Sequence, residues 1–117
     1  DRVRMPGFLP DPQQVLQASD VYVSSSHWEG YPLTLIEAYA AGLPVVARAC
    51  DFGPEEIVTA ERPGRLVRSK SVGDLAVAMA EVASNVRKVA PGAISLEENA
   101  PDFVVSRYRA LFGSSDR

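Results

Sequence analysis

One carboxylate stands inside a segment that is otherwise almost entirely apolar. Residues 32–42 carry only two hydrophilic side chains, Thr34 and Glu37, and the pattern predicts a helix. A helix that is apolar nearly all round is typical of a protein interior, so we expect this one to be buried. Because an unpaired buried charge is costly, Glu37 is then expected to bind a ligand or to pair with a cation.

A second carboxylate, Glu29, lies eight residues before Glu37, at the mouth of the predicted helix. The first N–H groups of a helix lack internal acceptors and carry the positive end of its dipole, so phosphate binds well there. Pro32 has no N–H, and four amides remain as donors: Gly30, Tyr31, Leu33 and Thr34. Further down the helix, Glu37 is placed to accept hydrogen bonds from vicinal hydroxyls such as those of ribose. Glu29 is placed to meet a sugar ring or a cationic transition state.

The residues leave a plainer interpretation open. Glu29 is then a solvated loop residue, and Glu37 pairs with an arginine such as Arg48. His27, in the same loop, is either a structural histidine or a contact to a ligand, and Trp28 is expected to pack against the protein.

Composition excludes several classes of protein. The chain has 117 residues, enough for one domain with a real core. Its net charge is −3 without a stripe of Lys or Arg, which argues against nucleic acid as a partner. The single cysteine excludes an internal disulfide and fits a reducing cytoplasm, and one His with one Cys argues against a metal site. No apolar run approaches the ~20 residues of a membrane span.

Short β-rich runs alternate with helical stretches along the chain. We expect strands at 3–5, 21–24, 44–47 and 65–67, and helices at 13–19, 32–41, 55–59 and 103–112, with another after Ser71 and a helical turn at 94–98. Asp11 before Pro12 predicts a helix N-cap, Gly42 a left-handed C-cap, and Ser71 with Asp74 a capping box. Residues 113–117 are expected to form a frayed tail.

This alternation predicts βαβ units in an α/β fold, a three-layer Rossmann-like parallel sheet of about four strands with helices on both faces. Ligands bind such sheets at the carboxyl ends of the strands. The candidate site is therefore built from two loops, residues 24–31 and residues 49–54.

Residues 21–47 resemble the donor-binding domain of retaining glycosyltransferases of the GT-B fold, in particular the large group called glycosyl transferases group 1, or family four. The resemblance lies in two glutamates separated by seven residues, Glu29 and Glu37, followed by Ala-Gly-x-Pro-Val. Residues 53–57 are similar to the Gly-rich turn and short helix of that family, and residues 64–67 with 75–76 to its closing strand and helix. The resemblance covers residues 2–84.

The resemblance implies roles for particular residues. Glu29 would be the catalytic-site acid that contacts the transferred sugar, and Gly30 and Tyr31 would line its pocket. The amides of Leu33 and Thr34 would hold the diphosphate, and Glu37 the ribose hydroxyls. Further candidate contacts are Ser26, His27 and Gly53. Many relatives have Gly where Pro32 stands, so phosphate binding is expected to shift to the next amides.

The family further implies the rest of an enzyme. Its members have an N-terminal acceptor domain and earlier strands with a basic pair, so residues 1–117 are expected to be one partial donor-binding domain, with an α/β core at 1–84 and a helical segment and tail at 85–117. The expected function is transfer of a glycosyl group from a nucleotide-diphosphate sugar to an acceptor hydroxyl on a sugar, lipid or small molecule, in polysaccharide or glycolipid biosynthesis. No cofactor or metal is expected. The location would be cytoplasmic, with the acceptor domain touching the inner membrane face, and these 117 residues alone would be inactive.

Two rival functions stay open. One is another GT-B enzyme of sugar nucleotides, such as an epimerase. The other is a non-catalytic α/β regulatory module such as a receiver domain. A receiver needs acids at the carboxyl end of a strand near its N-terminus, whereas Asp20 lies at the amino end of its predicted strand.

Overall fold

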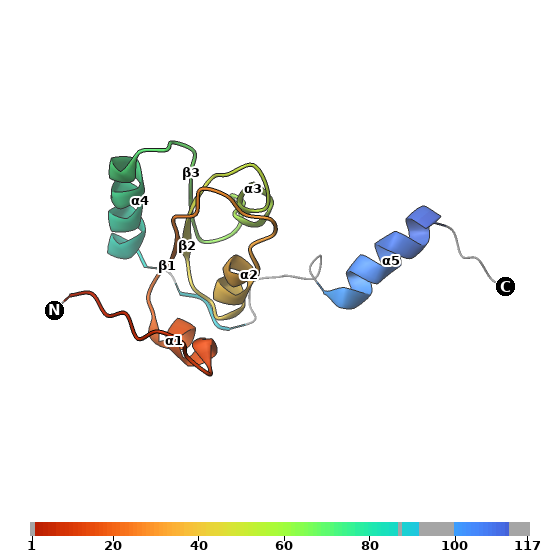
Figure 1. The fold of residues 1–117 in the computed structure, drawn as a ribbon, viewed down its shortest axis with the longest axis horizontal. Coiled ribbons are helices and arrows are strands. Elements are labelled where there is room, and N and C mark those ends of the chain that lie inside the picture. The colour runs from red at the N-terminus through yellow and green to blue at the C-terminus, as the bar shows by residue number, and fades with distance from the viewer. Residues whose placement is uncertain (1, 87, 92–99, 113–117) are drawn as a thin grey trace.

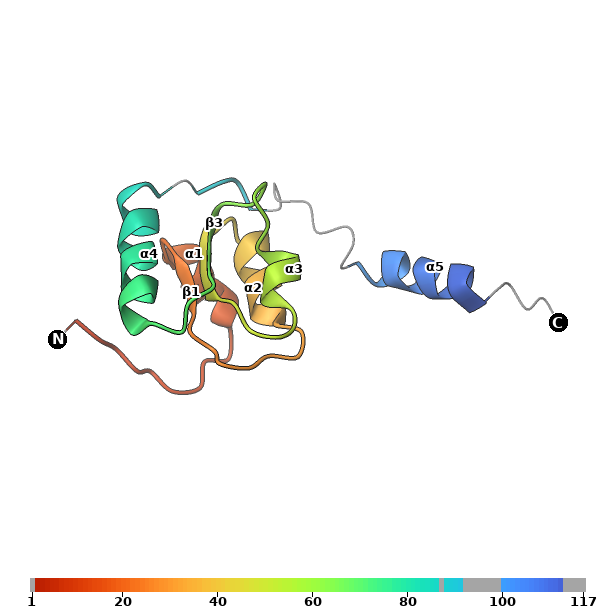
Figure 2. The same cartoon turned by 90° about the horizontal axis from the view of Figure 1, so that it is seen from above.

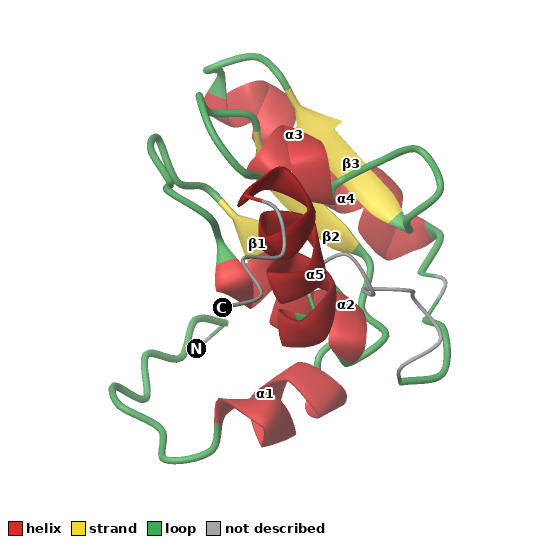
Figure 3. Cartoon of the chain, turned by 90° about the vertical axis from the view of Figure 1, so that its right-hand side faces the viewer, coloured by secondary structure: helices red, strands yellow, loops and turns green. Residues whose placement is uncertain are grey.

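A computed structural model describes residues 2–86, 88–91 and 100–112 of the chain. Its sheet has three parallel strands in the order β1 (Tyr22–Ser24), β2 (Val45–Arg48) and β3 (Gly64–Val67). Figure 3 shows the strands side by side in this order, with β2 in the middle. All four residues of β2 are buried, because both of its faces are covered.

Helices cover the two faces of the sheet, as expected for an α/β fold. Helices α2 (Leu33–Ala40) and α3 (Pro54–Ile57) lie on one face, and α4 (Val72–Ser84) lies on the other (Figures 1 and 2). Side chains alternate along β2, so that Val45 and Ala47 pack toward α2 whereas Val46 packs toward α4. The predicted three-layer α/β architecture is confirmed.

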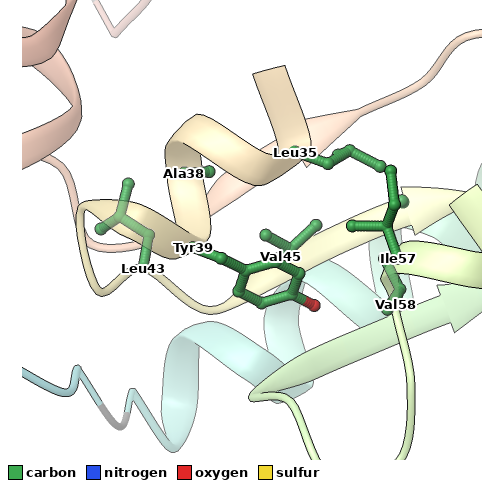
Figure 4. Packing of buried hydrophobic residues seen from close by; sticks show 8 residues of the cluster. Leu35, Ala38, Tyr39, Leu43, Val45, Ile57 and Val58 are labelled. Carbon is green, nitrogen blue, oxygen red and sulfur yellow. The ribbon is translucent and has the colours of Figure 1, made fainter. Parts of the chain in front are cut away.

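The larger half of the core lies between α2, α3 and the sheet. Figure 4 shows the side chains of this cluster converging from both helices onto Val45. Tyr39 is the largest fully buried side chain among the described residues. Its hydroxyl has no hydrogen-bond partner among the described residues, and the Arg62 guanidinium lies 5.8 Å from the centre of its ring. Burial raises the pKa of Tyr39 to about 12, against the opposing charge of Arg62.

Three predicted caps are present. Asp11 accepts a hydrogen bond from the Gln13 amide at the start of α1 (Pro12–Ala18), and Gly42, with φ 81°, follows α2. Ser71 caps α4 by accepting from the Asp74 amide. The return half of the capping box is replaced, because the Ser69 hydroxyl bonds the Asp74 carboxylate and also accepts from the Ser71 amide. Asp is one methylene shorter than the usual Glu, and Ser69 bridges the gap.

The predicted first strand is wrong. Residues 3–5 have no regular structure, and Val3 and Met5 are exposed, so the sheet has three strands in the described chain and not about four. The run of alternating apolar residues has no neighbouring strand to pair with. The helical turn predicted at 94–98 and the tail at 113–117 lie outside the described residues.

The last helix, α5 (Pro101–Phe112), stands apart from the layers in Figures 1 and 2. Its described side chains are exposed from Pro101 to Ala110, including Phe103 and Tyr108. The helix was predicted from its apolar side, but that side packs on no described part of the sheet domain. The proposed division into a core at 1–84 and a segment at 85–117 stays a prediction.

Candidate functional site

The two predicted site loops meet at the carboxyl edge of the sheet. The backbone of Gly53, in the loop after β2, lies so close to Pro32 and to the Gly30 carbonyl that a Cβ at this position would collide with the Pro32 ring. Gly53 has φ 85° and is the N-cap of α3. The close approach therefore fixes the loop that follows β2 against the loop that follows β1.

The N-terminus of α2 is open to a ligand. Pro32 is its N-cap residue and provides no side-chain hydrogen bond, in contrast to Asp11 and Ser71 at the starts of α1 and α4. Leu33 and Thr34, which begin the helix, are both exposed. Their amides have no intrahelical acceptor, so this end of α2 retains free donors and the positive end of the helix dipole.

The two glutamates lie in different environments. Glu29 is half-buried in the loop after β1, whereas Glu37 is exposed on α2. The expectation that Glu37 is buried was wrong, because α2 lies on the surface and buries only one side, through Leu35, Ala38 and Tyr39. An exposed carboxylate pays little desolvation cost, so its place in an apolar segment does not by itself require a partner.

The alternative pairing of Glu37 with Arg48 is also absent. Arg48 contacts His27 instead, with Nη1 3.2 Å from Nδ1 and 3.1 Å from Nε2 of the imidazole. No signal in the sequence predicts this contact, since His27 lies in a loop and Arg48 at the end of a strand, and neither pattern nor spacing relates them. It links the loop that carries Glu29 to the end of β2.

The two site loops and the first turn of α2 carry exposed apolar side chains. Trp28 is 74% exposed and Leu33 63%, so the expected packing of Trp28 was wrong. Tyr31 and Phe52 are exposed as well, and Phe52, which directly precedes Gly53, was not singled out from the sequence. Of the remaining predicted contacts, Ser26 is half-buried and Gly30 is exposed. Exposed apolar side chains therefore lie in both site loops and at the first residue of α2.

An exposed ion pair lies at this edge of the sheet. Arg68, just beyond β3, pairs with Glu55 of α3 at 3.2 Å, and both are exposed.

No group of three or more His, Cys, Asp or Glu residues in the described chain is placed to hold a metal ion. In the same part of the chain, no helix is long and apolar enough to cross a membrane.

A hollow of about 310 Å³ lies at the opposite edge of the sheet, near the amino ends of β2 and β3. Its charged lining residues, Arg65 and Glu81, form an ion pair with each other. None of the predicted site residues lines it. The open edge at α2 carries the acids and donors, so we take that edge as the functional one.

The chain belongs to the glycosyl transferases group 1 family, whose model matches residues 1–99. The family predicted from the residues is thereby confirmed. No solved structure matched the chain significantly.

Three curated relatives illustrate the range of the family. The chain is 26% identical over 117 residues to a poly(ribitol-phosphate) alpha-N-acetylglucosaminyltransferase of Staphylococcus aureus, a match that covers 96% of this chain and 24% of the relative. It is 33% identical over 81 residues to a UDP-Gal:alpha-D-GlcNAc-diphosphoundecaprenol alpha-1,3-galactosyltransferase of Escherichia coli, covering 69% of the chain and 21% of the relative. It is 29% identical over 79 residues to a poly(glycerol-phosphate) alpha-glucosyltransferase of Bacillus subtilis, covering 68% and 12%. The chain thus spans at most about a quarter of the length of these relatives.

Proposed function

We propose that the chain is the donor-binding part of a retaining glycosyltransferase that uses a nucleotide-diphosphate sugar. The observation that carries this proposal is the uncapped N-terminus of α2, with free amides at Leu33 and Thr34 between the half-buried Glu29 and the exposed Glu37. A diphosphate fits the free amides, a ribose fits the carboxylate further down the helix, and a sugar ring fits the carboxylate at its mouth.

In this reaction the bond between the anomeric carbon of the sugar and the diphosphate oxygen breaks, and a bond to the acceptor oxygen forms as the acceptor hydroxyl passes its proton to the leaving diphosphate. Negative charge develops on the leaving diphosphate, where the N-terminus of α2 would stabilise it electrostatically. Glu29 would lie beside the transferred sugar, where positive charge develops. The donor-binding part supplies these contacts without a metal, and the acceptor is held by other parts of the enzyme.

The names of relatives support the nucleotide-diphosphate sugar as donor and the retaining course of the reaction. One relative carries UDP-Gal, a nucleotide-diphosphate sugar, in its name, and three names describe alpha transfer. Retention converts an α-linked donor into an α-linked product. The acceptors in their names are polyol-phosphate polymers and a lipid-linked diphosphate, which supports a role for this chain in polysaccharide or glycolipid synthesis. We further propose that it acts on the cytoplasmic side of the membrane. An epimerase would not need such acceptors.

The test is direct binding of nucleoside diphosphates to the 117-residue chain. Trp28 is the only tryptophan and adjoins Glu29, so its fluorescence reports on the site. Titration with the diphosphates of uridine, guanosine, adenosine and thymidine should change this fluorescence, with a Kd below about 1 mM for at least one of them. If none binds, as judged also by calorimetry, the donor-binding proposal is wrong.

A further inference from the structure

Arg48 is the most buried charged residue of the described chain. It is the last residue of β2 and only 5% exposed, at the edge of the sheet where the candidate site lies. An arginine keeps its proton in proteins, so the positive charge stays even in this buried position. Taking such a charge out of water is costly unless it gains partners.

The guanidinium has few partners. Nη1 lies about equally far from both nitrogens of the His27 ring, and Nε is buried without any hydrogen-bond partner among the described residues. A donor cannot reach both ring nitrogens in the plane of the imidazole, because these nitrogens point in different directions. Nη1 therefore lies over the face of the ring, and His27 covers the cation without neutralising it.

Three other cations of the described chain pair with carboxylates. Arg65 pairs with Glu81, Arg68 with Glu55 and Lys88 with Asp20, and all three pairs are at least partly exposed. Arg48 lies at the edge of the sheet that carries the candidate site, whereas Arg65 and Glu81 line the hollow at the opposite edge. No carboxylate of the described chain is within ion-pair distance of Arg48. Glu29 and Asp51, the acids of the two site loops, form no ion pair with it.

Arg48 adjoins both site loops, since its side chain contacts His27 in one loop and its backbone leads into the other. His27 precedes Glu29 by two residues, and the residue after Arg48 begins the loop that leads to Gly53. The field of a charge in a poorly solvated place is screened less than that of a surface charge. An anion bound at the free amides of α2 would therefore feel Arg48 more than it feels the exposed, paired Arg68.

We propose that Arg48 determines the charge preference of the site. It favours ligands that carry a diphosphate over the neutral nucleoside, with His27 as its cover. This inference rests on the proposed function, since it assigns a residue to the same ligand. A purely structural Arg48 would instead hold the loop in place, and its loss would weaken the diphosphate and the nucleoside alike.

The test compares Arg48→Met and Arg48→Lys with wild type, using the best-binding nucleoside diphosphate, the matching nucleoside and inorganic pyrophosphate. Methionine keeps much of the side-chain length without the charge, and lysine keeps the charge without the planar fork. Arg68→Met is the matched control, because it removes a positive charge from the same edge of the sheet. Binding is measured by calorimetry and by NMR chemical-shift titration for the weak nucleoside.

We expect Arg48→Met to weaken diphosphate and pyrophosphate binding by about 10- to 100-fold, the range of a lost charge-assisted interaction, and to leave nucleoside binding within about 2-fold. Arg48→Lys should recover most of the loss, and Arg68→Met should change neither ligand by more than about 2-fold. His27→Ala, on an exposed residue that folding tolerates, should retain the preference for diphosphate.

Three results would overturn the inference. They are equal weakening of diphosphate and nucleoside in Arg48→Met, unchanged diphosphate affinity in that variant, and an Arg68→Met effect as large as that of Arg48→Met. If Arg48→Met does not fold, Arg48→Gln replaces it in the test. Loss of the preference for diphosphate in Arg48→Gln supports the inference, and retention of that preference overturns it. Failure of wild type to bind any nucleoside diphosphate contradicts the proposed function. The role of Arg48 is still tested in that case, because pyrophosphate binding either depends on Arg48 or does not.

Discussion

The backbone of Gly53 packs against the ring of Pro32, in a contact that leaves no space for a Cβ on Gly53. Pro32 is the N-cap residue of the helix whose N-terminus is the proposed phosphate site, and Gly53 is the N-cap residue of α3. The contact therefore couples the two loops of the site through their backbones, without any side chain that a ligand would also need.

Gly53→Ala should separate these loops. The added methyl group meets Pro32, and alanine is strained at φ 85°, so we expect a loss of more than about 1 kcal/mol in the free energy of unfolding and weaker diphosphate binding. Gly7→Ala is the control, because Gly7 has φ 75° but nothing within 4 Å of the added Cβ. Urea unfolding of both variants measures the difference, and equal effects would show that the backbone angle alone is responsible.

Glu37→Gln and Glu29→Gln should separate two roles. If Glu37 holds ribose hydroxyls, its neutral amide should weaken nucleoside diphosphate binding by about 1.5–3 kcal/mol, because hydrogen bonds to a charged acceptor are lost. Glu29→Gln should leave that affinity nearly unchanged, since in the proposed arrangement Glu29 contacts the sugar and not the nucleoside diphosphate. Calorimetry on the chain measures both, and in a full-length enzyme Glu29→Gln should mainly lower kcat.

This pair of variants carries its own control, because Glu37 is exposed and its substitution should not unfold the protein. Wild-type affinity in Glu37→Gln would remove the ribose role and leave an ordinary surface acid.

Leu33→Pro tests the free amides of α2. Proline is tolerated in the first turn of a helix but has no N–H, so one proposed phosphate donor is lost while the helix is kept. We expect diphosphate affinity to fall about 5- to 10-fold, as for one lost hydrogen bond. Leu33→Ala is the matched control, since it removes the same exposed side chain and keeps the amide. Equal affinities in the two variants would argue against the amide of Leu33 as a donor.

Tyr39→Phe should reveal an alkaline transition. The folded pKa of Tyr39 is raised to about 12 from its usual value of 10.0, so the neutral phenol is favoured in the folded state. Its contribution to stability is fully present below pH 10 and is lost as pH rises toward 12, by up to about 2–3 kcal/mol. Phenylalanine has no group to ionise and loses a hydroxyl without a described partner, so Tyr39→Phe should be at least as stable at pH 7 and less sensitive to alkali. Denaturant unfolding at pH 7 and pH 11 checks both.

Removing α5 should not destabilise the sheet domain. The described side chains of α5 are exposed, so they contribute little apolar burial to the core. We expect a chain ending at residue 99 to unfold within about 0.5 kcal/mol of the full chain. Chemical denaturation followed by Trp28 fluorescence measures this, and a clear loss of stability would mean that α5 packs on the domain in solution.

Much of the fold could be predicted because local signals agreed with it. Asp11, Gly42 and Ser71 have the residue types that cap helices, and the caps lie where these residues predict them. The strand at 3–5 was predicted from its local residue pattern alone, and without a neighbouring strand it does not form. Strands depend on partners distant in sequence, whereas helix caps depend on residues a few positions away.

The site was predicted less completely. The meeting of the two loops followed from the parallel sheet, since carboxyl ends of neighbouring strands share an edge. The prediction that Glu37 is buried was wrong. The number of buried faces on an apolar helix depends on the elements that pack against it, and the segment's own sequence does not show them. The contact between Arg48 and His27 joins the end of β2 to the loop after β1, and no local pattern relates the two residues.

The strand order bears on how this protein folds. Each strand pairs with the strand that follows it in the chain, so no pairing waits for a distant segment. The first pairing, between β1 and β2, encloses α2 and most of the larger core cluster. Low sequence separation between contacting residues favours fast folding. The segment that begins at β1 and ends at β2 is thus suited to act as a nucleus, onto which β3 and α4 add in turn, and it is the same segment that carries both glutamates and the arginine of the proposed site.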